Sequence, residues 1–337
     1  MLRKLVNEAY FTLRITTTGP LLIRSGHATV SGPDMTPVLT FRNGQQEVYL
    51  PGSSLKGVFR SHLEKIICSI KPRVACYPFW GNEAQDSDLL EQRQRDYRDS
   101  CSGRFVQRTR DEDERKRLEE RTDLVYQDCC PVCRLFGSTG FIGRVAIGDA
   151  YLTSKSIKEQ RDGVGIDRLT GGASHGAKFE LEVVSPGVTF ETDIHLRNFE
   201  IWQLGMLFVV LQDMEDELIR IGSGRSRGLG QIKAEVSLQE KNSRPGGVTT
   251  SAIRGTAEPA DELWGLGRWL NDRSYGTWTD DWLPLVQPIE RRDRGIRCQR
   301  VFTGDAMATL RDATIDHFIK RMQEWPVEGR AGAASSR

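Results

Sequence analysis

The spacing of apolar residues predicts a strand and then a helix at the start of the chain. Residues 9–23, AYFTLRITTTGPLLI, are rich in β-branched and aromatic types and are typical of a strand that ends in a Gly-Pro turn. Over residues 48–67 the apolar side chains recur three and four positions apart, as on one face of a helix. These side chains are Leu55, Val58, Phe59, Leu63, Ile66 and Ile67. We expect Ser53 or Ser54 to cap this helix.

The periodic pattern is lost between residues 70 and 140. This stretch is dense in charge and holds most of the cysteines, so we interpret it as an insertion. Its middle, RTRDEDERKRLEERTD at 108–123, mixes both signs of charge. Such a stretch is compatible with a solvated helix or with a disordered loop.

Three strand-like runs follow the insertion, at 144–152, 177–187 and 188–199. A polar, glycine-rich loop is expected between the first two, at 158–176. A second helix is expected from Ile201, because its apolar residues again recur at helical spacing, and a last strand is expected at 231–238.

The order strand, helix, strand, strand, helix, strand is that of the ferredoxin-like (RRM-like) split βαβ fold. We therefore predict an α+β protein with a ferredoxin-like core at 1–240 that carries a cysteine-bearing zinc insertion at 70–140. Residues 241–337 form a C-terminal extension, which begins with a linker at 241–262 and has a helix at 305–325. The tail at 328–337 is expected to be disordered.

Composition narrows the class of protein only slightly. Of 337 residues, 38% are hydrophobic and 28% charged, and 47 lysines and arginines nearly balance 46 acidic residues. Residues 218–234 are locally basic, with four basic and no acidic side chains, and such patches steer polyanions. The N-terminus lacks a signal-peptide pattern and no apolar run could span a membrane, so we expect a cytoplasmic location. Seven cysteines in that setting favour metal ligands or buried thiols over disulfides.

The basic stretch contains an unusual loop. Residues 221–233, IGSGRSRGLGQIK, place Arg225 and Arg227 among glycines. The glycines are Gly222, Gly224, Gly228 and Gly230. Glycine lets the backbone approach a ligand, and exposed amides in such a turn suit anions. The loop is neither a Walker loop nor a dinucleotide fingerprint, because it leads into a strand rather than a helix. It is compatible with a phosphate cradle or with a tight surface hairpin.

Four stretches together resemble the RAMP superfamily of CRISPR–Cas proteins. They are PGSSLKGVFRSHLE at 51–64, CPVCRLFGS at 130–138, DRLTGGASHGAKFELEVV at 167–184 and GSGRSRGLGQIKAEV at 222–236. The resemblance covers about residues 8–238 and is greatest to the backbone subunit of type III effector complexes. It implies binding of a guide (CRISPR) RNA, a complementary target RNA and other RAMP subunits, with no membrane partner. In such complexes protein reads the RNA backbone while base pairing reads sequence.

The resemblance implies which residues meet RNA. Along the helix they are Ser53, Ser54, Lys56 and Arg60, at a helix N-terminus suited to phosphate. In the glycine loop they are Gly222, Gly224, Arg225, Arg227 and Gly228. A solvated helix face is the other interpretation of Lys56 and Arg60. Residues 155–177 resemble the family's thumb, a hairpin that distorts the guide–target duplex, with Arg168, Leu169, Thr170 and His175 as contacts.

Asp34 is the candidate catalytic residue by the same resemblance. It lies in the loop SGHATVSGPDMTPV at 25–38, where the family's pattern of a glycine pair followed by an aspartate would place it. A carboxylate there, with Mg²⁺ or Mn²⁺, would align the target's 2′-hydroxyl for attack on its own phosphate and make the subunit an endoribonuclease. Pro33 departs from the family pattern, and Pro-Asp is also a common turn pair.

The cysteines predict a structural zinc site. Cys130 and Cys133 form half of a zinc knuckle, and Cys76 and Cys101 lie in the same insertion, where family members carry a cysteine-rich site. Cys129 is an alternative to Cys130, while Cys68 is expected to pack into the first helix. Buried thiols without metal are the other interpretation.

Two further functions stay open. The chain could be a catalytically silent backbone subunit whose neighbours cut the target. It could also be a guide-processing ribonuclease of the same superfamily, but such enzymes have two ferredoxin-like halves and a histidine-centred site.

Overall fold

The strand β1 (Asn7–Thr17) lies at the centre of the main sheet. In the computed structural model, which describes residues 4–26, 32–78, 95–254, 258–285 and 289–327, its side chains alternate between buried and half-exposed. Ala9, Phe11, Leu13 and Ile15 are buried, because successive side chains of a strand point to opposite faces. The side chains on the other face of β1 are mostly half-exposed.

Neighbouring strands pair with β1 on both sides. On one side β10 (Thr189–Arg197) runs antiparallel to it, with Tyr10 opposite His195. On the other side two strands share its length: β11 (Ile232–Val236) pairs with its second half and β12 (Val248–Ile253) with its first half. The sheet is thus antiparallel around β1.

Further strands extend this sheet. Beyond β10 lie β6 (Val145–Ile147), β7 (Ala150–Leu152), β3 (Gln45–Leu50) and β2 (Leu39–Arg42). Beyond β12 lie β16 (Arg297–Phe302) and β15 (Glu290–Arg294). Short two-stranded sheets are formed by β4 (Gly137–Ser138) with β5 (Phe141–Ile142) and by β13 (Glu262–Trp264) with β14 (Trp282–Pro284).

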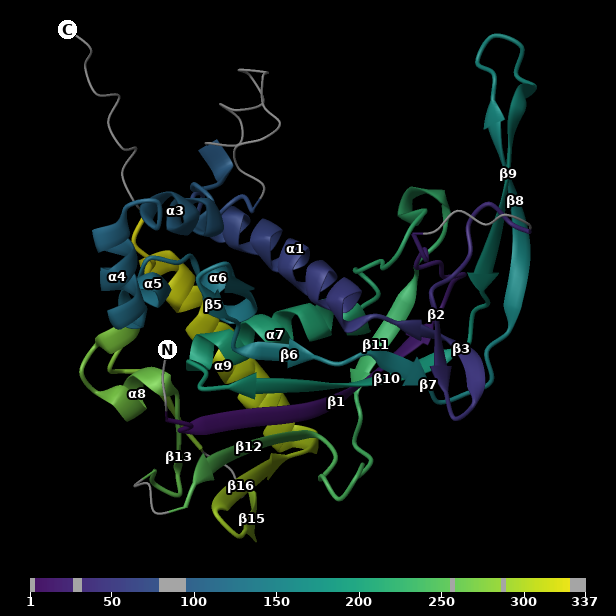
Figure 1. Ribbon diagram of the computed structural model, residues 1–337. Coiled ribbons are helices and arrows are strands. Elements are labelled where there is room, and N and C mark those ends of the chain that lie inside the picture. Colours follow the sequence, from purple (N-terminus) through teal and green to yellow (C-terminus); the bar gives the residue numbers. More distant parts are fainter. Residues whose placement is uncertain (1–3, 27–31, 79–94, 255–257, 286–288, 328–337) are drawn as a thin grey trace, which may run out of the picture.

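Three long helices pack together against the sheet (Figure 1). They are α1 (Gly52–Ile70), α7 (Ile201–Glu215) and α9 (Gly304–Glu324). The first two confirm the helices predicted from apolar spacing, and α9 confirms the predicted last helix. A Cβ at Gly205 would lie 2.0 Å from the backbone oxygen of Thr314, so only glycine lets α7 approach α9 so closely.

The insertion is largely helical in the part that the structure describes. It contains α3 (Cys101–Arg108), α4 (Glu112–Glu120), α5 (Thr122–Gln127) and α6 (Pro131–Phe136). The charge-dense stretch at 108–123 is therefore ordered as helix rather than loop. The Asp111 side chain caps α4 by accepting a hydrogen bond from the backbone N–H of Glu114 at 2.8 Å, which explains where this helix begins.

A long hairpin projects from the body of the protein (Figure 1). It consists of β8 (Lys158–Ile166) and β9 (Ala173–Val184). The prediction of a glycine-rich loop over 158–176 was therefore wrong, since only 167–172 lie outside the strands. Cross-strand pairing orders this polar stretch, although few of its side chains are buried.

The prediction of a linker at 241–262 was also wrong. Its residues include β12, whose side chains are almost all buried between β1 and β16. The C-terminal extension also contains α8 (Leu266–Leu270) and the 3-10 turn η2 (Ser274–Gly276). The division at residue 240 stays a prediction, although strands from both sides of it share one sheet. The tail at 328–337, expected to be disordered, lies outside the described residues.

Candidate functional site

A small apolar cluster, separate from the main core, joins three segments of the chain. Leu22, Val183 and Leu229 are buried in it, and Met35 and Leu181 pack against them. These residues come from the loops after β1, the base of the β8–β9 hairpin and the glycine loop. Burial of their side chains thus holds together three segments that are far apart in sequence.

Asp34 is attached to the hairpin base. Its Oδ2 accepts a hydrogen bond from the backbone N–H of Glu180 at 2.8 Å, while its side chain stays exposed. The next residue, Met35, exchanges backbone hydrogen bonds with Glu180 at 3.2 Å and Glu182 at 2.9 Å. The loop therefore runs along β9 as a short extra strand, and Asp34 lies on its surface.

The glycine loop is anchored at both ends. The backbone N–H of Ser223 donates to Leu22 O at 2.8 Å, and that of Gly230 donates to Pro20 O at 2.8 Å. Gly222 has φ +78°, and a Cβ there would lie 2.4 Å from Leu22 O. Glycine is therefore required at this position both for its backbone conformation and for the close approach.

The tip of this loop is exposed and basic. The 3-10 turn η1 (Arg225–Arg227) lies between Gly224 and Gly228, both left-handed. Arg225, Arg227 and Gly228 are exposed, and the Arg227 guanidinium lies over the Phe179 ring at 5.5 Å. Phe179 precedes Glu180, whose amide binds Asp34. Arg227 and Asp34 therefore both contact the base of the hairpin.

The N-terminus of α1 differs from the expectation. Its N-cap is Pro51, and no side chain of that residue caps the helix, so the prediction of Ser53 or Ser54 as N-cap was wrong. Instead the backbone N–H of Gly52 donates to Asp149 Oδ1 at 2.8 Å. A carboxylate of the protein itself thus lies at this helix N-terminus, where the sequence suggested that an RNA phosphate would bind.

The two basic residues of α1 have different surroundings. Lys56 is half-buried, and burial together with the nearby Arg60 charge lowers its pKa. Arg60 donates from Nε to Glu64 at 2.9 Å, from Nη1 to Gly137 O at 3.4 Å and from Nη2 to Cys133 Sγ at 3.2 Å. Burial opposes its charge, but Cys133 and Glu64 raise its pKa overall. Arg60 is thus engaged by the cysteine-bearing insertion.

The hairpin tip presents the other predicted contacts. Arg168, Thr170 and His175 are exposed, and Leu169 is 97% exposed. Asp167 organises the turn, because its Oδ1 accepts hydrogen bonds from the amides of Leu169 at 2.9 Å and Thr170 at 2.8 Å. The tip is separated from Glu180, the residue that binds Asp34, by the outer part of β9.

The four cysteines predicted as zinc ligands lie together. The sulfurs of Cys76, Cys101, Cys130 and Cys133 are all within 4.8 Å of one another and all four residues are buried. Four sulfurs around tetrahedral zinc at about 2.3 Å stand about 3.8 Å apart, and an all-sulfur set selects zinc or iron–sulfur clusters. The donor set and spacing therefore fit a structural zinc ion.

The environment of these thiols also favours a cation. Hydrogen bonds from neighbouring thiols and from the Cys133 amide offset burial and lower the pKa of Cys130. Hydrogen bonds among the neighbouring cysteine sulfurs, which for Cys101 come first from Cys129, and burial raise the pKa values of Cys76, Cys101 and Cys133. Because the four thiolates repel one another, a bound cation is what allows all of them to ionise.

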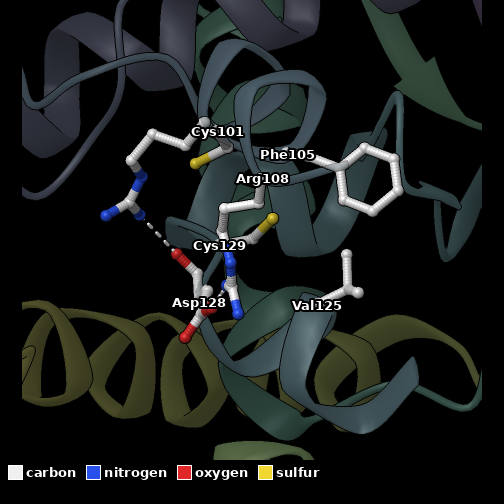
Figure 2. Close-up of a pocket in the computed structure, with 7 residues that line it drawn as sticks. Cys101, Phe105, Arg108, Val125, Asp128 and Cys129 are labelled. Carbon is white, nitrogen blue, oxygen red and sulfur yellow. Dashed lines mark hydrogen bonds and ion pairs between the residues drawn. The ribbon is translucent and has the colours of Figure 1, made fainter. Parts of the chain in front are cut away.

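Cys129 and Cys68 stay outside this cluster. Cys129 lines a small pocket of about 60 Å³ beside it, with Cys101, Phe105, Val125 and an Arg108–Asp128 ion pair (Figure 2). Its sulfur is 3.8 Å from Ser138 Oγ. Cys68 lies on α1 and donates to Asp96 O at 3.2 Å. The geometry therefore selects Cys130 over its neighbour in the sequence.

Comparison with known families agrees with this arrangement. The family model described as RAMP superfamily matches residues 14–233, which is more than half of the chain. The chain belongs to the RAMP superfamily. RAMP proteins are associated with RNA-binding subunits of CRISPR–Cas systems, so membership implies RNA binding and assembly with other subunits. No curated protein matches the chain.

The RAMP match contains the cysteine cluster, the hairpin and the glycine loop, and ends in β11. Of the elements that come after it, β12, β15 and β16 belong to the same sheet, and α9 packs against α1 and α7. Among the helices of the described ranges, none is both long and apolar enough to cross a bilayer.

Sequence reasoning missed three features of this RAMP protein. It did not find Asp149 at the α1 N-terminus, Phe179 beneath Arg227, or the apolar cluster around Leu229. Each depends on contacts between distant segments. The one available signal was Leu229 itself, an apolar residue between two glycines in an otherwise polar loop.

Proposed function

We propose that this protein is a guide-RNA-binding backbone subunit of a type III CRISPR effector complex. In this proposal β1, α1, β6–β7, β10, α7 and β11 make a ferredoxin-like core. The pairings support it: β1 lies between β10 and β11, and β6 and β7 lie beyond β10. The β8–β9 hairpin then serves as the thumb, and the complex acts in the cytoplasm against foreign RNA.

One observation carries the proposal. The apolar cluster of Leu22, Val183 and Leu229 brings the glycine loop, the hairpin base and the Asp34 loop together. Exposed Arg225 and Arg227 can contact guide phosphates, and the hairpin, which projects from the body of the protein, would enter the guide–target duplex. A surface hairpin alone does not explain why Arg227 packs on Phe179, the residue next to the one that binds Asp34.

The proposed catalytic role is that Asp34 acts on the target strand. Its exposed carboxylate would orient the 2′-hydroxyl and take its proton as the 2′ oxygen attacks the adjacent phosphorus. The P–O5′ bond breaks, and the leaving oxygen takes a proton from water, which gives a cyclic phosphate and a 5′-hydroxyl end. Among the described residues the cysteines form the one grouping of three or more potential metal ligands. No second protein ligand is assigned beside Asp34 in the described part of the loop, and we derive no step through a Mg²⁺ or Mn²⁺ ion.

A catalytically silent backbone subunit is the second candidate. The observation that favours it is the hydrogen bond from Glu180 N–H to Asp34 Oδ2, because this bond gives the carboxylate a structural task. Both candidates share the same RNA-binding surface, and they differ only in whether Asp34 acts on the target.

The experiment that tests RNA binding replaces both loop arginines. The variant Arg225→Ala/Arg227→Ala is compared with Arg115→Ala/Lys116→Ala, which removes two exposed positive charges from α4. Guide-RNA affinity is measured over a series of salt concentrations. We expect the loop variant to bind more weakly and its log–log salt slope to fall by roughly one to two, one per lost phosphate contact. Equal affinities and slopes for both variants would contradict the proposal.

A further inference from the structure

A second basic hollow lies at the opposite end of β1 from the glycine loop. It is a pocket of about 490 Å³ between the start of β1, the end of β10 and the start of β16. The side chains that matter here are Lys4, Glu8, Arg144, His195, Arg197 and Arg297. Glu8 and Thr17 are nine positions apart in β1, which is roughly 30 Å in a strand, so this pocket is distinct from the loop surface.

The pocket carries an excess of positive charge. Four of its side chains are cationic and one, Glu8, is a carboxylate. That carboxylate is already satisfied: Tyr10 Oη donates to it at 2.8 Å, Arg297 Nε donates to it at 2.8 Å, and His195 Nε2 lies 2.9 Å away. Glu8 therefore pairs with Arg297 and leaves the charges of Lys4, Arg144 and Arg197 without an acid in the pocket.

Arg144 is the unusual member. It is only 5% exposed, yet among the described residues its Nε and Nη2 have no hydrogen-bond partner. Its guanidinium packs over the Tyr126 ring at 4.7 Å. The buried carboxyl of Glu200 acts on it electrostatically, but burial raises the pKa of that carboxyl and so favours its neutral form. Arg144 thus carries a buried positive charge with two nitrogens that lack hydrogen bonds, and an anion in the pocket that it lines would offset this charge.

One planar side chain borders the same pocket, and it stacks on a ring that lines the neighbouring pocket. The His195 ring, which lines it, stacks on Tyr10 with ring centroids 3.9 Å apart, and Arg244 lies over Tyr10 at 4.9 Å. Tyr10 and His195 are directly opposite on neighbouring strands. Aromatic rings on adjacent strands beside basic side chains are a common way to hold the base and phosphate of a nucleotide.

We propose that this pocket binds a nucleotide phosphate, with Arg144, Arg197 and Lys4 as its ligands. The phosphate comes either from a free nucleotide or from an RNA strand, since both offer the same group. The proposal does not depend on the glycine loop, because no residue is shared between the two surfaces.

The test measures binding of AMP to the full chain by calorimetry, with adenosine and inorganic phosphate as further probes. We expect AMP to bind and adenosine not to bind. We expect Arg144→Met and the exposed pair Lys4→Met/Arg197→Met each to weaken AMP binding about tenfold or more. The second variant answers the question even if the first fails to fold. Absence of AMP binding, or unchanged binding in Lys4→Met/Arg197→Met, would overturn the proposal.

Two further experiments identify the source of the phosphate and separate this pocket from the glycine-loop surface. Displacement of AMP by RNA without terminal phosphates would assign the site to a strand's internal phosphates. Displacement only by 5′-phosphorylated RNA or by free nucleotides would assign it to a terminal phosphate. The variant Arg225→Ala/Arg227→Ala should keep its AMP affinity, so failure of guide-RNA binding at the glycine loop leaves this result unaffected.

Discussion

Arg60 donates a hydrogen bond from Nη2 to Cys133 Sγ at 3.2 Å, although its position in the sequence suggested contact with guide RNA. We predict that Arg60→Met lowers zinc affinity by about 10- to 100-fold, because outer partners orient and stabilise metal ligands. The salt dependence of RNA binding should stay unchanged. Competition with a chromogenic chelator measures the first quantity, and RNA titration measures the second.

Lys56→Met is the matched control for that experiment, since Lys56 lies one turn earlier on α1 and contacts no cysteine in the described structure. It should leave zinc affinity intact and make the salt slope of RNA binding shallower. The reverse pattern, in which Arg60→Met weakens RNA binding and leaves zinc affinity unchanged, would show that the Arg60–Cys133 contact does not stabilise the zinc site.

The cysteine cluster predicts one bound zinc ion per chain. Cys133→Ser should abolish zinc binding and lower the free energy of unfolding by roughly 4 kcal/mol or more, because metal binding and folding of such a segment are coupled. Cys129→Ser, in a buried residue beside the cluster but outside it, should retain the metal. Metal analysis and thermal unfolding of both variants test this, and zinc loss in the Cys129 variant alone would refute the assigned set.

Two loop glycines should respond differently to alanine. Gly228 has φ +84° with open space around its position, so Gly228→Ala is expected to cost roughly 1 kcal/mol of backbone strain. Gly222 has a similar φ, but an added Cβ meets Leu22 O, and we expect roughly 1–3 kcal/mol more. Denaturant unfolding measures both. Equal costs would mean that the loop shifts freely away from Leu22.

Glu8 predicts a pH-dependent contribution to stability. Burial tends to raise its pKa, but His195, Arg297 and Tyr10 together lower it from 4.5 to about 2. The stabilisation is therefore complete above pH 4.5 and is lost as the pH falls towards 2, and it amounts to roughly 3 kcal/mol. Glu8→Gln should flatten the stability curve in that window. If Glu8→Gln and the wild-type protein lose the same free energy of unfolding between pH 5 and pH 3, this account is contradicted.

The sequence predicted those elements whose pattern is local. Helices α1 and α7 followed from apolar spacing, and the cysteine set followed from the Cys-x-x-Cys pair and two cysteines in the same insertion. The strand β12 was missed because it is only six residues long and is flanked by turn-forming residues. Its partner β1 also lies more than 230 residues earlier in the sequence.

Side-chain direction was the least predictable feature of the site. Arg60 and Lys56 lie on the same helix, yet only Arg60 meets the insertion, because Cys133 and Gly137 reach α1 through a contact about 75 residues away in sequence. Similarly, the attachment of Asp34 to Glu180 depends on the fold of the hairpin. Local patterns determine elements, while distant contacts determine what each polar side chain meets.

Cleavage of target RNA by the reconstituted complex tests the central claim most directly. Asp34→Asn keeps an oxygen that can accept from Glu180 N–H but removes the charge, whereas Asp34→Ala removes both. If Asp34 is catalytic, both variants lose the same cuts while guide and target binding remain. If Asp34→Asn cuts at the wild-type rate, the carboxylate is structural and the chain is a silent backbone subunit.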